Sequence, residues 1–420
     1  MSSPPLKILF VDDEELVLRG MQRVLRDHAN QWDMTFVDSA AEALRLMEAR
    51  PYDAVVSDMQ MPGMNGAALL NHVMRLHPRT IRIALSGYAD RDMILQCVGA
   101  AHQYLAKPCD GPTLKSVLER ITRLIQTDRD ETIRQLVARC PVLPSVPVVY
   151  SQLVEALNSP HATLEDIGAI VAADAAMSTQ MLKLVNSAFF SLGRRITHPA
   201  EATQFLGIEA VKALVLSAHL FLPIARNLPE GVSATRIWTH SQACAGAAKS
   251  IAVELGASRS TANEAHVAGL LHDIGKLLLA ANLPEEYRQA LEFARNEQVA
   301  LRDSERAVFG ADHAEVGGYF LGLLGLPAPV IEAVSFHHQP SLAVSPESIP
   351  LAALHLGNAI AAVDAPALAL VPHSRVDPGF LDRRGLTHDL DFWRQLGRAD
   401  EETASDSNSP IASTAENRLS

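Results

Sequence analysis

The first 107 residues alternate between short apolar runs and amphipathic stretches, and this alternation constrains the fold more than any other feature. Four runs have the length and composition of β-strands, namely Lys7–Asp12, Tyr52–Ser57, Arg82–Leu85 and Gln103–Ala106. Helical patterns such as Ala40–Ala49 and Ala67–Leu76 lie between them. Strands that alternate with helices predict a parallel sheet with helices on both faces.

Polar residues stand where these four runs stop. The first run leads into Asp12 and Asp13, the second into Asp58, the third into Ser86 and the fourth into Lys107. In a parallel α/β sheet the functional crevice opens at the carboxyl ends of the strands. We therefore expect these acidic, hydroxyl and amine groups to meet at one edge of the sheet.

The residue types in this set point to phosphoryl chemistry. Crowded carboxylates bind a hard cation, and Mg²⁺ suits one or two carboxylates together with waters and phosphate oxygens. One carboxylate can then act as a nucleophile and become an aspartyl phosphate. Ser86 can donate a hydrogen bond to a phosphoryl oxygen, and Lys107 can pair with its charge.

The segments around these residues resemble a known family. VDDE at 11–14, SDMQMPGMNG at 57–66, LSGY at 85–88 and YLAKP at 104–108 are similar to the motifs of response-regulator receiver domains. The resemblance covers residues 5–125 and implies a flavodoxin-like fold with a five-stranded parallel sheet. It also implies a sensor histidine kinase as partner.

The same resemblance assigns a role to each site residue. It implies that Asp58 is the phosphoacceptor, and that Asp13 and Asp58 bind Mg²⁺ with the backbone carbonyl of Gln60, supported by Asp12. Ser86 and Tyr104 would form the switch pair, and Lys107 would complete the charge of the site.

Composition limits the remaining possibilities. The chain of 420 residues has a net charge of −12 and no long Lys/Arg cluster, which argues against direct nucleic-acid binding. Its four cysteines lack CxxC spacing and fit a reducing cytoplasm. The longest apolar stretch, Ala210–Leu222, is interrupted by Lys212 and His219 and is shorter than the ~18–20 residues of a membrane span. We expect a cytoplasmic protein without membrane insertion.

A proline-rich break, Pro141–Pro147, predicts a domain boundary. Before it, a helix is expected after Asp110, which would act as its cap. Its apolar stripe resumes after a polar interval, which predicts a linker helix at residues 126–142 that packs on the next domain. A coupling helix or a dimerising coil, and with it a homodimer, is the alternative that two or three heptads leave open.

Beyond the break the patterns are almost entirely helical, which predicts an all-α domain. We expect it at residues 143–345, with a helical extension at 346–396 and a disordered acidic tail at 397–420. The expected helices are Val149–Leu157, Leu164–Ala172, Ser178–Val185, Ala200–Leu206, Ala210–Leu222, Ile237–Leu255, Asn263–Ala280, Pro284–Asn296, Leu301–Val308, His313–Leu324, Val330–His337 and Ile349–Val363.

This helical half concentrates residue types that bind metals. His240, the pair His272-Asp273, His313 and the pair His337-His338 would come from separate helices and converge. Histidine beside aspartate suits Fe, Mn or Zn, and such a site can activate water against a phosphoester. The alternative is that these histidines lie in helical cores, with backbone or carboxylate partners.

The motifs of this half resemble an HDOD domain, the regulatory branch of the HD metal-phosphohydrolase superfamily. They are LPSVP at 143–147, IVAADAAMSTQMLKLVNSAFF at 170–190, AGLLHDIGKLLL at 268–279, DHAEVGGYFLGLLGLP at 312–327 and FHHQP at 336–340. In the catalytic branch, the residues corresponding to His240, His272, Asp273, His313, His337 and His338 are metal ligands, and Lys276 corresponds to a phosphate contact.

Two departures from the catalytic pattern favour a regulatory or vestigial metal site. Asn358 stands where a terminal aspartate ligand is expected, and Gln339-Pro340 follows the histidine pair in place of a glycine-tyrosine-proline signature. We therefore expect a response regulator that is not an enzyme and that acts on a downstream signalling protein. The alternative is a phosphorylation-gated, metal-dependent phosphodiesterase of cyclic dinucleotides or nucleotides. A DNA-binding transcription factor fits the acidic composition poorly.

Overall fold

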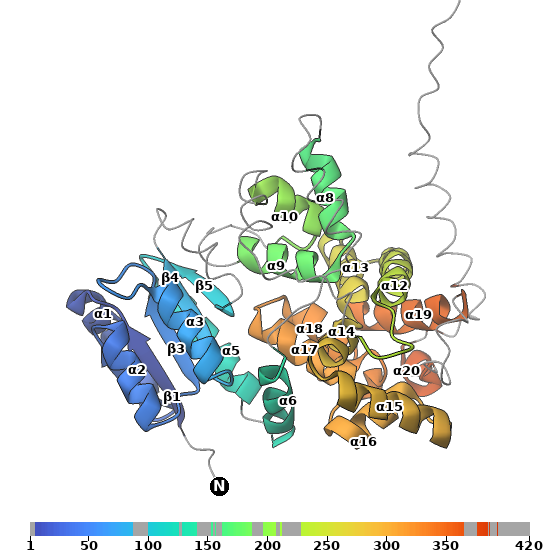
Figure 1. Ribbon diagram of the computed structural model, residues 1–420. Helices are drawn as coiled ribbons and strands as arrows, with labels where there is room; N and C mark the ends of the chain where they lie inside the picture. Colours follow the sequence, from blue (N-terminus) through green and yellow to red (C-terminus); the bar gives the residue numbers. More distant parts are fainter. Residues whose placement is uncertain are drawn as a thin grey trace, which may run out of the picture.

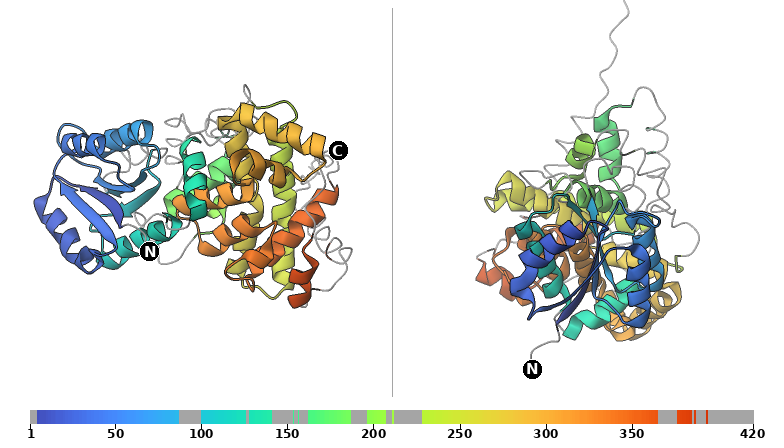
Figure 2. Two further views of the ribbon diagram at one scale, coloured as in Figure 1. Left: turned by 90° about the horizontal axis from the view of Figure 1, so that it is seen from below. Right: turned by 90° about the vertical axis from the view of Figure 1, so that its left-hand side faces the viewer.

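The computed structural model describes residues 5–86, 100–125, 128–140, 162–186, 196–206, 228–364 and 376–384, together with a few single positions. An α/β part and a helical part lie side by side, and helix α6 (Asp128–Ala138) lies near their junction (Figures 1 and 2). No helix among the described residues is long and apolar enough to cross a membrane.

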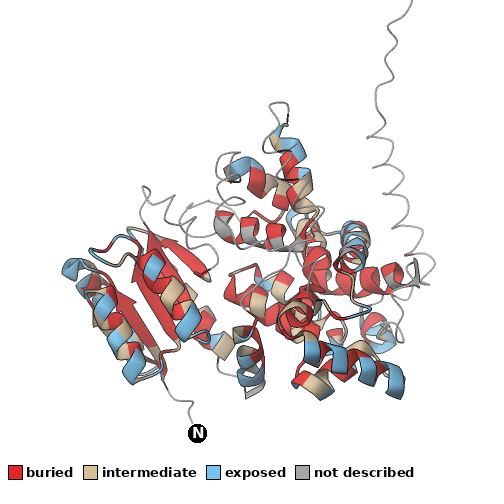
Figure 3. Cartoon of the chain, viewed as in Figure 1, coloured by how far each residue is buried: buried red, intermediate tan, exposed pale blue. Residues whose placement is uncertain are grey.

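The α/β part is built on one parallel sheet. Its order is β2-β1-β3-β4-β5, which confirms the five-stranded parallel sheet expected from the sequence. Every residue of β3 is buried, because neighbouring strands and helices enclose the centre of the sheet (Figure 3). The strands are β1 (Leu6–Val11), β2 (Trp32–Val37), β3 (Ala54–Asp58), β4 (Ile81–Ser86) and β5 (Gln103–Ala106).

Among the described residues of this part, four helices and one 3₁₀ turn accompany the sheet. Helix α1 (Glu15–Leu25), which is followed by η1 (Arg26–His28), packs beside α5 (Gly111–Ile125). Helix α2 (Ala40–Ala49) packs beside α3 (Gly66–Leu76). The Thr113 amide donates to Asp110 Oδ1 at 2.7 Å, so Asp110 caps the first turn of α5 as predicted.

The second part of the chain is helical throughout its described ranges. Helix α12 packs against α13 and α19, and α17 packs against α14 and α18. The elements are α8 (Leu164–Ala172), α9 (Ala175–Val185), α10 (Pro199–Leu206), α12 (Ala234–Glu254), α13 (Arg259–Leu271), α14 (Ile274–Asn282), α15 (Pro284–Glu297), α16 (Leu301–Phe309), α17 (His313–Leu323), α18 (Ala328–Phe336), η5 (Pro340–Leu342), α19 (Ile349–Asp364) and α20 (Pro378–Arg383).

One helix prediction is wrong. Asn263–Ala280 was expected as a single helix, but α13 ends at Leu271 and α14 begins at Ile274. The apolar spacing continues across the break, so periodicity does not reveal it. The break lies at His272-Asp273, and both side chains turn into the interior, where each is at most 2% exposed.

Other predictions fall on residues that the structure does not describe. The helix Ala210–Leu222, the boundary segment Pro141–Pro147 and the tail at 397–420 lie outside the described residues, apart from single positions. The same holds for most of Val149–Leu157 and of the extension beyond Asp364.

Helix α6 lies within the predicted linker and contacts both parts of the chain. Arg134 Nη2 lies 2.9 Å from Asp53 Oδ1 of the α/β part, and Arg139 forms an ion pair with Glu286 of α15. The apolar side chains of α6 are buried within the chain, where α6 packs against α17. This packing favours the linker-helix interpretation over an exposed dimerising stripe.

Candidate functional site

The residues predicted at the strand ends do converge. Lys107 Nζ lies 2.7 Å from Asp12 Oδ2 and 2.7 Å from Asp58 Oδ1, so one ammonium bridges two strand ends. Carboxylate oxygens of Asp12, Asp13 and Asp58 all lie within 4.8 Å of one another. Asp12 is held by the Glu14 amide, which donates to its Oδ1 at 3.0 Å.

The charge balance of this pocket favours a divalent cation. Three carboxylates face one ammonium, which leaves an excess of two negative charges when all are ionised. Burial raises the pKa of Asp58, and the neighbouring Asp12 raises it further, although Lys107 opposes the shift. Burial by itself lowers the pKa of Lys107, but the two carboxylates outweigh it and raise that pKa. The acidic pocket is of the kind that binds Mg²⁺.

The loop after β3 brings α3 directly against the end of that strand. A Cβ on Gly66 would lie 1.9 Å from the Asp58 carbonyl oxygen, so only glycine fits here. The Gly66 amide donates to the Met59 carbonyl at 3.1 Å, and Asn65 caps α3 through the Ala68 amide at 2.9 Å. Gln60 lies exposed in this same loop.

The two predicted switch residues lie on β4 and β5. Ser86 follows Leu85, which pairs with Asp58, and its carbonyl accepts from the Lys107 amide at 2.8 Å. Tyr104 is 1% exposed. Lys183 of α9 covers it, with Nζ at 5.4 Å from the centroid of the Tyr104 ring.

The helical part contacts β5 at further points. Lys183 Nζ donates to the Ala101 carbonyl, just before the strand. Gln103 Nε2 donates to the Leu323 carbonyl at the end of α17, at 2.9 Å. Arg120 of α5 donates to Gln103 Oε1 on the same side. Strand β5, which carries the predicted switch residue Tyr104, is therefore in direct contact with the second half of the chain.

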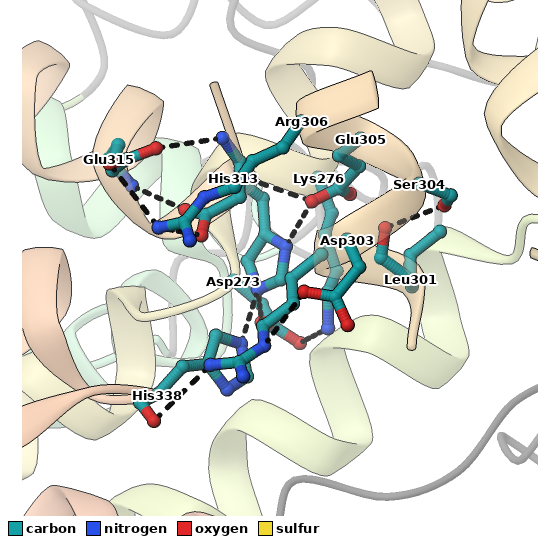
Figure 4. A network of polar contacts seen from close by, with 12 residues as sticks. Asp273, Lys276, Leu301, Asp303, Ser304, Glu305, Arg306, His313, Glu315 and His338 are labelled. Carbon is teal, nitrogen blue, oxygen red and sulfur yellow. Dashed lines mark hydrogen bonds and ion pairs between the residues drawn. The ribbon is translucent and has the colours of Figure 1, made fainter. Parts of the chain in front are cut away.

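The histidines of the helical part form one cluster, as predicted. His313, His337 and His338 offer ligand atoms within 4.8 Å of one another, and so do His240, His272 and Asp273. His313 Nε2 lies 3.5 Å from Asp273 Oδ1, which joins the two groups (Figure 4). Helices α12, α17 and the ends of α13 and α18 supply the six residues.

Asn358 of α19 reaches the same cluster. Its Oδ1 lies 3.0 Å from Nε2 of His240. An amide oxygen is neutral, so it adds no charge where an aspartate would add one. Asp273 is thus the one carboxylate among the seven predicted residues.

Two of the imidazole rings, those of His272 and His337, are held in the orientation that metal ligands need. The Nδ1 atoms of His272 and His337 lie 2.7 Å from the carbonyl oxygens of Gly269 and Val334. Because a carbonyl oxygen only accepts, each Nδ1 carries the proton and each Nε2 carries a lone pair. Both Nε2 atoms are buried without a hydrogen-bond partner. Leaving such an atom unpaired costs about 1–3 kcal/mol, which a bound cation would offset.

Burial keeps these groups in their metal-binding protonation states. It lowers the pKa of His272 to about 4 and the pKa of His337 well below its usual range, so both rings are neutral. Burial opposes ionisation of Asp273, but His272 and Lys276 outweigh it and hold the pKa well below its usual range. Lys276 Nζ donates to Asp273 Oδ2 at 2.7 Å. The donor set fits a transition metal such as Zn, Mn or Fe.

Two residues of this region were not predicted from the sequence. Glu305 is a fully buried carboxylate beside His313, and Lys183 is the cation over Tyr104. Glu305 stands four residues after Leu301 and four before Phe309, on the apolar face of α16. A charged residue in such a stripe is a signal that sequence analysis can detect.

Comparison with known families settles the identity of both halves. The response regulator receiver domain model matches residues 8–119, and the HDOD domain model matches residues 143–340. This chain is a response regulator with a receiver and an HDOD domain. The receiver provides the acidic pocket, and the HDOD domain provides the histidine cluster.

Individual relatives share only part of their length with this response regulator. A Treponema pallidum protein described as uncharacterized is 26% identical over 214 residues, which is 51% of this chain and 41% of that protein. The hydrogenase transcriptional regulatory protein HoxA of Cupriavidus necator is 34% identical over 110 residues, 26% of this chain and 22% of HoxA. The chain thus spans less than half the length of these curated relatives.

Two solved structures are also similar. The signal receiver domain of an HD domain-containing protein from Pseudomonas fluorescens is 30% identical and covers 29% of this chain and 96% of its own, with a TM-score of 0.27. The MmoQ response regulator from Methylococcus capsulatus is 28% identical and covers 61% of this chain and 98% of its own, with a TM-score of 0.45.

Proposed function

We propose that this protein is the output component of a two-component system, in which Asp58 accepts a phosphoryl group from a sensor histidine kinase. The pocket that supports this role is complete, since Lys107 joins Asp12 and Asp58 at 2.7 Å and Asp13 lies beside them. The HDOD domain would pass the signal to a downstream protein by contact, without catalysis.

The phosphoryl transfer follows from the pocket. A carboxylate oxygen of Asp58 attacks the phosphorus, the bond to the donor histidine nitrogen breaks, and that nitrogen keeps the electron pair and takes up a proton. Bound Mg²⁺ would neutralise charge on the phosphoryl oxygens. Lys107, which already contacts Asp58, pairs with the new dianion, and Ser86 donates to one of its oxygens.

The contact between Lys183 and Tyr104 supports a direct route from receiver to HDOD domain. Lys183 is 4% exposed, donates to the Ala101 carbonyl and lies over the Tyr104 ring. When Ser86 turns toward the phosphoryl group and the Tyr104 ring follows, this cation loses its aromatic partner. We propose that the resulting loss of α9 contact at β5 is the signal that reaches the HDOD domain.

Hydrogen exchange tests this route with beryllofluoride and Mg²⁺ as the phosphoryl mimic. We expect the mimic to speed amide exchange in β5 and α9 of the wild type. Lys183→Met should raise exchange there without the mimic, whereas Lys249→Met, on the exposed face of α12, should not. Identical exchange in wild type and Lys183→Met, with and without the mimic, would refute the route.

We also propose that the histidine cluster binds a transition metal in a regulatory role. The inward Nε2 atoms favour metal binding, whereas Asn358 beside His240 in place of a carboxylate argues against hydrolysis. A phosphodiesterase is the second candidate, because the same cluster could activate water. Metal analysis of the purified protein, with turnover assays on cyclic dinucleotides and nucleotides, separates the two. Turnover that His272→Ala and Asp273→Ala abolish would overturn the regulatory role.

A further inference from the structure

Glu305 is a carboxylate in the interior of the HDOD domain, next to the histidine cluster but outside the predicted ligand set. It is 0% exposed. Its Oε2 accepts from the His313 amide at 2.9 Å and lies 2.5 Å from His313 Nδ1. Its Oε1 accepts from the Tyr287 hydroxyl at 3.2 Å. Figure 4 shows Glu305 directed at His313, with Asp273 and His338 on the other side of the ring.

Burial of a carboxylate such as Glu305 is unfavourable unless something compensates for it. Removing an ionised group from water costs several kcal/mol unless a partner compensates. Among the described residues no lysine or arginine forms an ion pair with Glu305, and its ion-pair partner is His313. An apolar side chain at this position would pack α16 against α17 without this desolvation cost. The position therefore points to a task that requires a hydrogen-bond acceptor.

That task follows from the place of His313 in its helix. His272 and His337 each donate Nδ1–H to the carbonyl three residues earlier, at the end of a helix. His313 is the first residue of α17, so no preceding helical turn offers it a carbonyl. Glu305 supplies the acceptor from α16 instead. With the proton on Nδ1, the lone pair of His313 Nε2 faces Asp273 Oδ1 at 3.5 Å and His338 Nε2 at 2.9 Å.

We propose that Glu305 is a positioning residue of the HDOD metal site, which fixes the Nδ1–H tautomer of His313 and strengthens Nε2 as a metal ligand. A carboxylate raises the basicity of the imidazole it accepts from, more than a neutral carbonyl does. Tyr287 holds the other carboxylate oxygen and so restrains the rotation of Glu305. This inference rests on the metal site proposed above.

The test compares full-length wild type with Glu305→Gln, Glu305→Ala and the control Tyr287→Phe, using Zn²⁺ alone as the probe. Glu305→Gln keeps an oxygen for His313 and the shape of the side chain, but it removes the charge. We expect its Zn²⁺ affinity to fall about 10–100-fold. Tyr287→Phe should have a smaller effect, because Glu305 still contacts His313.

Imidazole ¹⁵N spectra of the metal-free proteins provide the second readout, with the His313 signal assigned through His313→Asn. We expect the Nδ1–H tautomer in the wild type and in Glu305→Gln, and a mixture of tautomers in Glu305→Ala. Unchanged tautomer and affinity in both Glu305 variants would overturn the proposal. A wild type that binds no Zn²⁺ would overturn the metal site, and the tautomer spectra would still decide the role of Glu305.

Discussion

Gly275 offers a sharp test of how the two halves of the histidine cluster are held together. It lies on α14, two residues after Asp273, and faces the first residue of α17. A Cβ at Gly275 would lie 2.0 Å from the His313 carbonyl oxygen, whereas real Cβ contacts essentially never come below 3.0 Å. Gly275→Ala therefore forces α14 and α17 apart by at least about 1 Å.

The expected cost can be worked out from opposing effects. Alanine is favoured over glycine by about 1 kcal/mol in a helix interior, and by less at Gly275, which lies in the first turn of α14. Overpacking a well-packed contact costs typically ~1–3 kcal/mol, and more when the clashing atom belongs to the backbone. We expect a net destabilisation of about 1–2 kcal/mol, since the clash exceeds the helix gain. Ligand distances must hold within about 0.2 Å, so a 1 Å displacement should also abolish tight metal binding.

The assay is urea unfolding followed by far-ultraviolet circular dichroism, combined with Zn²⁺ titration. Gly246→Ala is the matched control, because Gly246 lies exposed within α12 and its Cβ would meet nothing within 4 Å. That variant should be more stable by about 0.5–1 kcal/mol and should bind Zn²⁺ normally. If Gly275→Ala behaves like Gly246→Ala in both measurements, close approach of α14 and α17 does not hold the cluster together.

Three further predictions concern charge. Mg²⁺ at ten times its Kd should stabilise the wild-type receiver by about 1.4 kcal/mol, and Asp13→Asn should lose most of this thermal shift. Without metal, the raised pKa of Asp58 means that ionising this residue costs stability. The folded protein therefore gains stability from protonated Asp58 at pH values below the pKa that this residue has in the unfolded chain. This gain is lost as the pH rises through the pKa of Asp58 in the folded protein. Thermal melting of Asp58→Asn in the presence of a chelator should show no such loss of stability. If its stability depended on pH as that of the wild type does, Asp58 would not be the group responsible. Asn358→Asp adds a carboxylate beside His240, so it should tighten Mn²⁺ binding on the order of tenfold, or about 1.4 kcal/mol. A calorimetric titration measures this affinity, and an unchanged value would place Asn358 outside the site.

The sequence by itself determined the receiver and its pocket. Strand patterns are local, and the carboxyl ends of parallel strands must share one edge, so Asp13, Asp58 and Lys107 could be brought together without a structure. The histidine cluster could also be predicted from the sequence, because its histidines and aspartate are residue types that together suit one metal site. In both cases the chemistry of the side chains limits which of them can be neighbours.

Only the tertiary structure decided how the cluster is built and how the two domains meet. The apolar spacing runs through His272 and Asp273, so it does not reveal the helix break at these residues, after which α14 packs against α17. Glu305 meets His313, and Lys183 meets Tyr104, because helices and a strand from different parts of the chain pack together. Periodicity records which side of an element is buried. It does not record which element covers that side, and this choice follows from the packing of the whole chain.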